Sequence, residues 1–228
     1  MWIKICANTN LDDAQLATEL GADAVGFVFA PSARNMTAAD VAKITPHMPS
    51  WVERVGVFPA LEAEEIAFTA QQAGLNAIQL HGGVSLDLIR RLHKILNGSA
   101  KLIQTVHWNV AANDTANASA AVVANHLREI AADGLVDRVL IDSKVGAATG
   151  GTGIPFDWEA ARKTFVEAGT GLKLIVAGGL REDNVADAIR GLRPWGIDVA
   201  SGVEQTPGKK SPEKLAAFIR KARQFAAQ

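Results

Sequence analysis

The sequence lacks a second cysteine, a strong charge imbalance and any long hydrophobic run, and each absence excludes a class of protein. Its one cysteine, Cys6, cannot form an internal disulfide, which fits a reducing cytoplasm. A formal net charge of −1 at pH 7 gives no broad attraction to nucleic acid or to anionic membranes. No apolar run approaches the roughly 18 residues of a membrane span, and the first residues show no signal-peptide pattern. We therefore expect a cytoplasmic protein with neither nucleic-acid nor membrane partners.

What is present is enough apolar material for a sizeable core, because 48% of the 228 residues are hydrophobic. Eight short apolar runs have the length and composition of β-strands. They span residues 2–6, 24–29, 52–58, 76–81, 101–107, 136–142, 172–177 and 196–200. Segments with helical spacing lie between and after these runs. Such regular alternation of strand and helix predicts a parallel sheet of the α/β class.

Eight strand-helix units in a chain of this length favour a closed (β/α)8 TIM barrel, formed by residues 1–228 as one domain. An open doubly wound sheet uses the same local signals and stays the alternative. Ser211-Pro212-Glu213 predicts the start of the last helix, and Thr37 with Asp40 predicts the start of an earlier one. Residues 109–120 are polar and small, and we expect a surface loop that opens the fifth helix.

In a barrel, the active site lies at the carboxyl ends of the strands, and alternate strand residues point inward. In the first strand this places Ile3 and Ile5 against the helices, with Lys4 and Cys6 facing the barrel. A lone buried cysteine is commonly only a small hydrophobe, but this one ends its strand at the catalytic rim. An inward Lys4 needs a counterion, and Asp198 on the eighth strand is the obvious candidate. We therefore expect Lys4 and Asp198 to form a structural ion pair.

Three further polar residues end strands or follow them at the same rim. Asp142 ends the sixth strand and, together with Cys6, would complete an acid/base pair. Arg34 lies in the loop after the second strand, where its bidentate fork could grip a carboxylate. His81 ends the fourth strand, either as a polar wall residue of the site or as a satisfied core histidine. The remaining histidines have no spacing that suggests a metal site. They are His47, His93, His107 and His126.

Glycine-bearing loops follow the sixth, seventh and eighth strands. They contain Gly150-Gly151-Thr152-Gly153, Gly178-Gly179 and Ser201-Gly202. Glycines let backbone N–H groups approach an anion closely, and the loops after barrel strands seven and eight often bind phosphate. Any one of these loops is explained by a tight turn alone. Three at one rim predict a phosphate site.

Together, these residues and their order resemble the phosphoribosylanthranilate isomerase family of tryptophan biosynthesis, over almost the whole chain. The motifs that carry the resemblance are Lys4-Ile5-Cys6, the loop ending at Arg34, Val55-Gly56-Val57-Phe58, Gln79-Leu80-His81-Gly82, Asp142-Ser143-Lys144, Gly150-Gly151-Thr152-Gly153, Ala177-Gly178-Gly179-Leu180 and Asp198-Val199-Ala200-Ser201-Gly202-Val203-Glu204. No single motif is decisive, but their order and positions together are specific.

The resemblance implies an aldose–ketose isomerase that performs an Amadori rearrangement of N-(5-phosphoribosyl)anthranilate, with no cofactor and no metal. Asp142 matches the general acid, Cys6 the general base and Arg34 the group that holds the anthranilate carboxylate. The three glycine loops match the phosphate site. Members of the family occur as monomers and dimers. Two positions depart from the family pattern: Ala7 stands where glycine is usual, and the arginine loop reads Ala33-Arg34-Asn35. A methyl group at residue 7 would restrict this loop if the backbone there needs a positive φ.

Three other interpretations compete with this one, and the sequence argues against each. The related aminoaldose isomerase of histidine biosynthesis does the same chemistry. That enzyme is expected to have an aspartate where Cys6 stands and to bind a substrate with two phosphates, which argues against it here. A ribulose-phosphate epimerase needs metal-binding residues at strand ends, and the second and third strands end near Phe29 and Phe58 instead. A barrel that only binds a phosphorylated metabolite would not need both Cys6 and Asp142.

Overall fold

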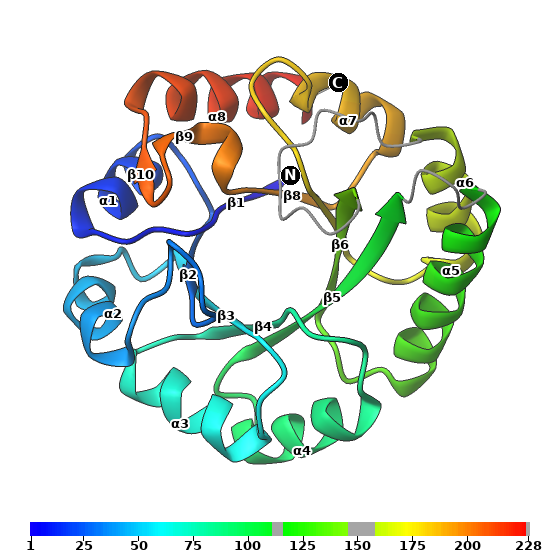
Figure 1. Cartoon of the computed structure of the whole chain (residues 1–228), viewed down its shortest axis with the longest axis horizontal. Coiled ribbons are helices and arrows are strands. Elements are labelled where there is room, and N and C mark those ends of the chain that lie inside the picture. The colour runs from blue at the N-terminus through cyan, green and yellow to red at the C-terminus, as the bar shows by residue number, and fades with distance from the viewer. Residues whose placement is uncertain (111–115, 146–157, 227–228) are drawn as a thin grey trace.

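The computed structural model describes residues 1–110, 116–145 and 158–226, in which eight parallel strands close into a barrel and eight α-helices surround it (Figure 1). The barrel strands are β1 (Trp2–Ile5), β2 (Ala24–Val28), β3 (Glu53–Phe58), β4 (Ala77–Leu80), β5 (Lys101–Val110), β6 (Arg138–Val145), β7 (Leu174–Ala177) and β8 (Gly196–Val199). The helices are α1 (Leu11–Glu19), α2 (Ala38–Ile44), α3 (Ala63–Gln72), α4 (Leu86–Leu96), α5 (Ala116–Asp133), α6 (Trp158–Ala168), α7 (Val185–Leu192) and α8 (Pro212–Ala226). The predicted barrel is confirmed, and β8 pairs with β1 to close it.

Helices begin where the sequence predicts them because side chains satisfy their first N–H groups. Thr37 accepts a hydrogen bond from the backbone N–H of Asp40 at the start of α2. At the start of α8, Ser211 Oγ accepts from the backbone N–H of Lys214. The buried face of α8 is an apolar stripe, with Leu215 fully buried against the barrel.

The barrel interior is filled by side chains from alternate positions of the strands, so it is a packed core. Its apolar part is contributed by Trp2, Ala24, Val55, Ala77, Ile103, Leu140, Ile175 and Ala177. Ile3 and Ile5 point the other way and pack in a separate core cluster with Ala14 and Ala17 of α1. The alternation predicted for the first strand is therefore confirmed, and it turns Lys4 into the barrel.

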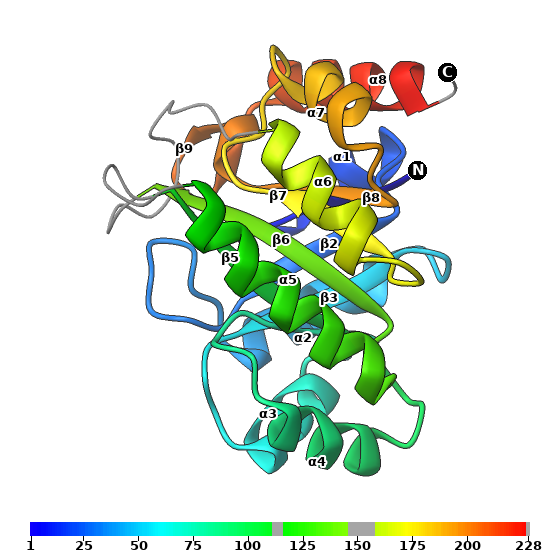
Figure 2. The same ribbon diagram turned by 90° about the vertical axis from the view of Figure 1, so that its right-hand side faces the viewer.

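Two strands are longer than predicted. β5 and β6 pair as far as Val110 and Val145, whereas the β4–β5 ladder ends at Gln104 and the β6–β7 ladder ends at Asp142. The pair therefore extends beyond the other strands at the carboxyl end of the barrel, as Figure 2 shows. The expected loop over residues 109–120 is wrong at both ends, because residues 109–110 continue β5 and α5 begins at Ala116.

Two small features were not predicted. After β8, a 3-10 turn η2 (Ser201–Val203) leads into an antiparallel hairpin of β9 (Glu204–Thr206) and β10 (Lys209–Lys210). Another 3-10 turn, η1 (Thr45–His47), follows α2. The hairpin is tied to α1 because Asp13 accepts hydrogen bonds from Lys209 Nζ and from the backbone N–H of Lys210. Among the described residues, no helix is long and apolar enough to cross a membrane.

Candidate active site

Cys6 directly follows β1 and is buried, with 6% of its surface exposed. Its backbone N–H donates to the carbonyl of Val199 at 2.8 Å, which fixes it beside the end of β8. The thiol lies against Gly26 of β2, because a Cβ atom at that position would be 2.8 Å from Cys6 Sγ and 2.9 Å from Lys4 Cε. Glycine at residue 26 therefore makes the space that the cysteine and the lysine occupy.

Lys4 is completely buried, and its Nζ lies 2.9 Å from Asp198 Oδ1 across the β1–β8 ladder. Burial alone would lower the pKa of Lys4, but the charges of Asp198 and Cys6, together with the hydrogen bonds to them, outweigh burial and raise the pKa. Burial raises the pKa of the Cys6 thiol, and the charge of Lys4 offsets only part of that rise. Cys6 is accordingly a thiol at neutral pH, and its thiolate, once formed, is a strong base.

Ala7 has a φ of 61°, the left-handed conformation that favours glycine. The departure from the family pattern thus falls at a position where an alanine is strained. Neighbouring groups hold the turn: Asn8 Nδ2 donates to the carbonyls of Ile5 and Gly26 at 2.8 and 3.2 Å, and the backbone N–H of Asn8 also donates to Gly26. The strain is therefore stored next to Cys6 in a rigid turn.

Arg34 is held at the rim by a carboxylate that sequence reasoning did not single out. Its Nε lies 2.9 and 3.1 Å from the two carboxylate oxygens of Glu204, and its Nη2 lies 2.6 Å from Oε2. The Gly208 N–H also donates to Glu204, and Lys210 Nζ lies 3.4 Å from it. Burial alone would raise the pKa of Glu204, but the bond from Arg34 and the charge of Lys210 lower it.

Lys210 connects this carboxylate to the cysteine. Its ammonium is fully buried and donates to the carbonyl of Cys6 at 2.5 Å and to that of Ala200 at 3.3 Å, besides its contact with Glu204. Burial lowers the pKa of Lys210, and the charge of Glu204 counteracts this only in part. One side of the mouth is thus a continuous network that begins at the partly exposed Arg34 and runs through the buried Glu204 and Lys210 to the backbone of Cys6.

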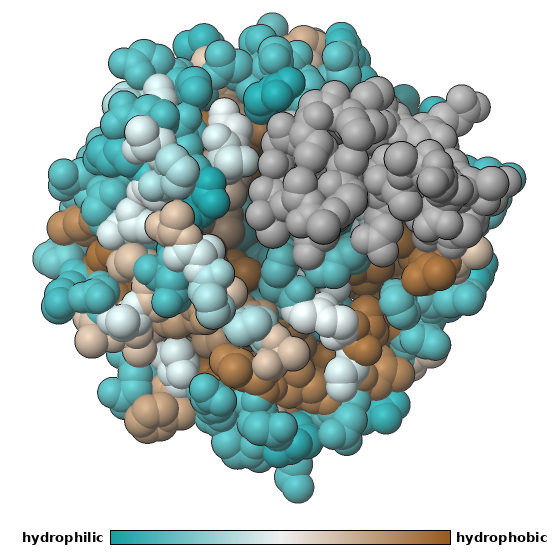
Figure 3. All heavy atoms as spheres, in the orientation of Figure 1, coloured by the Kyte–Doolittle hydropathy of each residue, from teal (hydrophilic) through white to brown (hydrophobic). Residues whose placement is uncertain are grey.

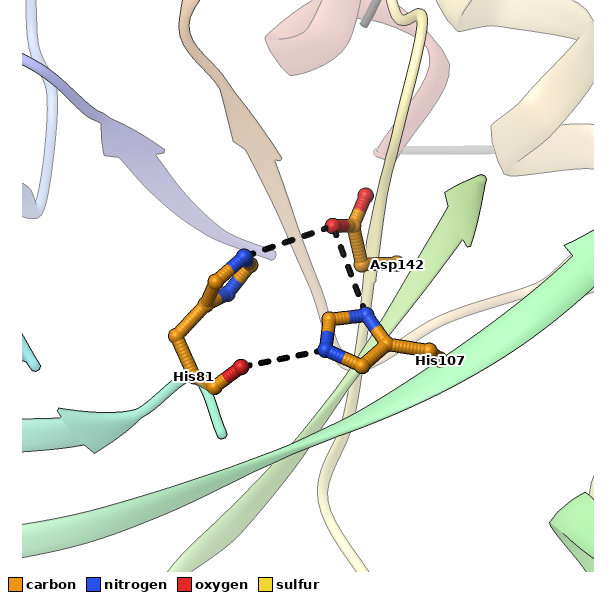
Figure 4. A group of neighbouring side chains, drawn as sticks. All are labelled: His81, His107 and Asp142. Atoms are coloured by element: carbon orange, nitrogen blue, oxygen red, sulfur yellow. Dashed lines mark hydrogen bonds and ion pairs between the residues drawn. The ribbon is translucent and has the colours of Figure 1, made fainter. Parts of the chain in front are cut away.

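On the other side of the mouth, Asp142 lies between two histidines (Figure 4). His81 Nε2 is 3.9 Å and His107 Nδ1 is 3.7 Å from the same oxygen, Asp142 Oδ2. His107 Nε2 is 3.0 Å from the carbonyl oxygen of His81, and the two rings meet edge to face with centroids 4.9 Å apart. The side chains keep partial contact with solvent, with 34%, 21% and 18% exposure for His81, His107 and Asp142.

His107 is the residue that sequence reasoning missed here. The histidines were compared by their spacing along the chain, which carries no information about neighbouring strands. The usable signal is the strand register, which places His107 of β5 directly opposite Asp142 of β6. In the described part of the chain, His81, His107 and Asp142 form the one group of three potential ligands whose donor atoms lie within 4.8 Å of one another. We assign no metal to it, and metal independence stays a prediction.

The glycine loops follow β7 and β8 as expected. Gly178 and Gly179 have φ values of 91° and 64°, which only glycine adopts without strain. A Cβ atom at Gly202 would lie 1.8 Å from the carbonyl oxygen of Leu180, so glycine there lets the two loops approach each other closely. Gly151, Thr152 and Gly153 lie outside the described residues. On the same face, hydrophobic residues gather between the strand ends and helices α3 and α4 (Figure 3).

Comparisons with known proteins agree with this arrangement. The family model described as N-(5'phosphoribosyl)anthranilate (PRA) isomerase matches residues 3–221. Curated proteins named N-(5'-phosphoribosyl)anthranilate isomerase are similar over nearly their whole length: that of Acidithiobacillus ferrooxidans is 40% identical over 222 residues, covering 97% of each chain. That of Thermotoga maritima is 38% identical over 226 residues, covering 97% of this chain and 98% of the relative.

Solved structures give the same result. The crystal structure of phosphoribosyl anthranilate isomerase from Thermotoga maritima has a TM-score of 0.81 at 36% identity, covering 98% of this chain and 99% of that one. A phosphoribosyl anthranilate isomerase in complex with reduced 1-(o-carboxyphenylamino)-1-deoxyribulose 5-phosphate has a TM-score of 0.78 at 34% identity, with the same coverage. With its sequence matched almost from end to end and its barrel shared with these enzymes, the chain belongs to the N-(5'-phosphoribosyl)anthranilate isomerase family and is an isomerase.

Proposed function

We propose that this protein converts N-(5-phosphoribosyl)anthranilate to 1-(2-carboxyphenylamino)-1-deoxyribulose 5-phosphate, with Asp142 as general acid and Cys6 as general base. The observation that carries this assignment is that both residues lie at the same mouth of the closed barrel, Cys6 directly after β1 and Asp142 within β6, where the β6–β7 ladder ends. A carboxyl group and a thiol are suited to the two proton transfers that an Amadori rearrangement requires.

Asp142 acts first. Its carboxylic acid gives a proton to the ring oxygen of the ribose as the bond from that oxygen to C1 breaks, and the electron pair of this bond stays on oxygen. The lone pair of the anthranilate nitrogen forms a C=N bond to C1, which gives an iminium ion. Partial exposure of Asp142 to solvent lets the carboxylate regain a proton between turnovers.

Cys6 acts second. Its thiolate removes the proton from C2, and the electrons of the C–H bond form a C1=C2 double bond while the iminium becomes a neutral amine. The resulting enolamine tautomerises to the ketone. The raised pKa of Cys6 makes the thiolate scarce at neutral pH but strongly basic, and the buried charge of Lys4 favours its formation. Removal of the C2 proton is therefore expected to accelerate as pH rises.

In this proposal the remaining residues at the barrel mouth bind the substrate. Arg34 would hold the anthranilate carboxylate, with Glu204 fixing its guanidinium. His81 would form the polar wall beside Asp142. Backbone N–H groups of Gly178, Gly179, Ser201 and Gly202 would bind the phosphate, together with Gly151, Thr152 and Gly153 outside the described residues. No cofactor or metal enters this scheme.

The chain's setting is proposed on the same basis: a cytoplasmic enzyme with a small phosphorylated substrate, no nucleic-acid partner, and either a monomer or a homodimer. One solved relative, from Thermotoga maritima, is described as mutually generated monomers of a dimeric isomerase. Sedimentation of the purified chain decides between the two states.

Rescue of a tryptophan auxotroph that lacks only this isomerase tests the function. We expect the wild-type chain to restore growth, and Cys6→Ala and Asp142→Asn to fail although both are folded and expressed. Failure of the soluble wild-type chain would overturn the assignment, while rescue by Asp142→Asn would remove Asp142 as the acid. Additional rescue of a histidine auxotroph would show a second, aminoaldose substrate.

A further inference from the structure

We propose that Lys210 is a positioning residue for the base: its buried ammonium fixes the backbone of Cys6, and its charge stabilises the Cys6 thiolate. The inference rests on the proposed function and deepens it. Lys210 lies on β10, beyond the last barrel strand, and none of its side chain is exposed. An ammonium taken out of water is costly unless each of its hydrogens finds an acceptor.

The contacts of the Lys210 ammonium account for its charged state. Its Nζ donates to the carbonyl of Cys6 at 2.5 Å, to the carbonyl of Ala200 at 3.3 Å and to Glu204 Oε1 at 3.4 Å. These are three acceptors for the three hydrogens of an ammonium, whereas a neutral amine has only two hydrogens to donate. The bond to the Cys6 carbonyl holds the backbone of the residue whose thiol lies in the barrel mouth.

The charge of Lys210 is only partly neutralised by its carboxylate. Glu204 makes its short contacts, 2.6 to 3.1 Å, with Arg34 and lies 3.4 Å from Lys210, so two cations share one carboxylate. Lys4 differs, because its Nζ lies 2.9 Å from a carboxylate of its own, Asp198. The charge of Asp198 opposes that of Lys4 at the thiol. The cluster around Lys210 therefore supplies a positive charge that is not matched one to one.

Charged groups from four parts of the fold act on the Cys6 thiol. They are Lys4 of β1, Asp198 of β8, Lys210 of β10 and Arg34 of the loop after β2. A nearby positive charge favours a thiolate over a thiol. At an effective dielectric constant of about 20, a unit charge about 6 Å away is equivalent to a change of about two pH units in a titration. Since Glu204 counteracts Lys210, we expect about half of this effect.

The test titrates the Cys6 thiol in purified wild type and in Lys210→Met. The chain contains one cysteine and no tyrosine, so the ultraviolet absorbance of the thiolate, measured against Cys6→Ser, reports this residue. We expect the pKa of Cys6 to lie about one pH unit higher in Lys210→Met than in wild type. Lys209→Met is the matched control: this lysine of the same hairpin binds Asp13, and 46% of its side chain is exposed. It should leave the Cys6 titration unchanged.

The pH dependence of kcat separates the charge of Lys210 from a structural role. In Lys210→Met the thiolate becomes scarcer but is no weaker as a base, so kcat should fall by up to about tenfold at neutral pH and recover at alkaline pH. Displacement of the thiol would instead lower kcat equally at every pH. Such a uniform loss with an unchanged thiol titration would overturn the proposal, as would an equal shift in Lys209→Met.

Glu204→Gln tests the opposite sign, and it also covers the case that Lys210→Met, which removes three buried hydrogen bonds, does not fold. This variant removes the negative charge beside Lys210, while the amide oxygen can still accept from the ammonium. We expect the pKa of Cys6 to fall below its wild-type value, and a rise or no change would overturn the proposal. The titrations need no substrate. If wild type fails to isomerise the substrate while they behave as expected, the proposed function is lost and the effect of Lys210 on Cys6 stands.

Discussion

The two sides of the barrel mouth are built differently. Around Cys6, the charged groups Lys4 and Lys210 are completely buried, and they are held by contacts of 2.5 to 3.4 Å. Around Asp142, the two imidazole nitrogens stand 3.7 and 3.9 Å from the carboxylate, and all three side chains keep some contact with water. The side around Cys6, the proposed base, is therefore tightly held and shielded from water, whereas the side around Asp142, the proposed acid, is loosely spaced and open to proton exchange.

This difference suits the two proton transfers. A thiolate used as a base gains strength from burial, because desolvation makes the charged form less stable and more reactive toward protons. A general acid that loses its proton in every turnover needs contact with solvent to regain it. The comparison predicts that substitutions on the base side act first on stability, while those on the acid side act on the pH dependence of the rate.

The largest effect is expected for Lys4→Met, which leaves Asp198 charged and without its partner in the barrel. Removing one member of a buried pair typically costs about 3–5 kcal/mol, so we expect a loss of about 3 kcal/mol in the free energy of unfolding, measured by urea denaturation. The control is Lys43→Met, which breaks the exposed Lys43–Asp40 pair and should cost less than about 0.5 kcal/mol. Equal losses in the two variants would show that the buried Lys4–Asp198 pair contributes no more to stability than an exposed pair.

Gly26→Ala is expected to come next. The new methyl group would lie 2.8 Å from Cys6 Sγ and 2.9 Å from Lys4 Cε, and overpacking of this kind costs about 1–3 kcal/mol. Displacement of the thiol should also reduce kcat. Gly83→Ala serves as the stability control, since nothing lies within 4 Å of a Cβ atom there. If Gly26→Ala unfolds at the wild-type urea concentration and turns over normally, then Cys6 is not tightly held.

Glu204→Gln should act on substrate binding. Arg34 would lose its charged partner and the fixed direction of its guanidinium, so we expect KM to rise about tenfold, or about 1.4 kcal/mol, with a smaller change in kcat. Glu53→Gln breaks another arginine–glutamate pair, with Arg138 at the amino ends of β3 and β6, and should affect stability without affecting KM. A fall in kcat alone for Glu204→Gln would show that Arg34 does not contact the substrate.

The smallest effect is expected for Ala7→Gly. Removal of the methyl group relieves the strain at φ 61° but also loses a buried contact and adds unfolded-state entropy, so the net gain should be about 0.5 kcal/mol. For a chain of this size we expect the melting temperature to rise by about 1–2 °C, followed by circular dichroism. A clear loss of stability would mean that the methyl contact outweighs the strain.

Much of this fold was predictable because strand and helix signals are local. Each of the eight apolar runs became a strand, and the caps at Thr37 and Ser211 work over three residues. The hairpin β9–β10 was missed because its strands are only three and two residues long. Its residues Glu204 and Lys210 therefore had no predicted part in the site, although they surround Arg34 and Cys6.

The site was predictable where it depends on strand ends and unpredictable where it depends on register. Cys6, Arg34 and Asp142 were found because parallel strands bring their carboxyl ends to one rim. His107 lies 35 residues before Asp142 in the chain, and only the barrel's strand pairing makes them neighbours. The strain at Ala7 likewise depends on the path of the backbone after β1.

The central claim is that Asp142 opens the ring and Cys6 removes the C2 proton. The most direct test measures kcat/KM for substrate carrying deuterium at C2, in Cys6→Ser and in Asp142→Asn. Weakening the base should make C–H cleavage rate-limiting, so Cys6→Ser is predicted to show a large primary isotope effect. Weakening the acid should make ring opening rate-limiting, so Asp142→Asn is predicted to show almost none. Equal isotope effects in the two variants, or the reverse order, would contradict the assignment.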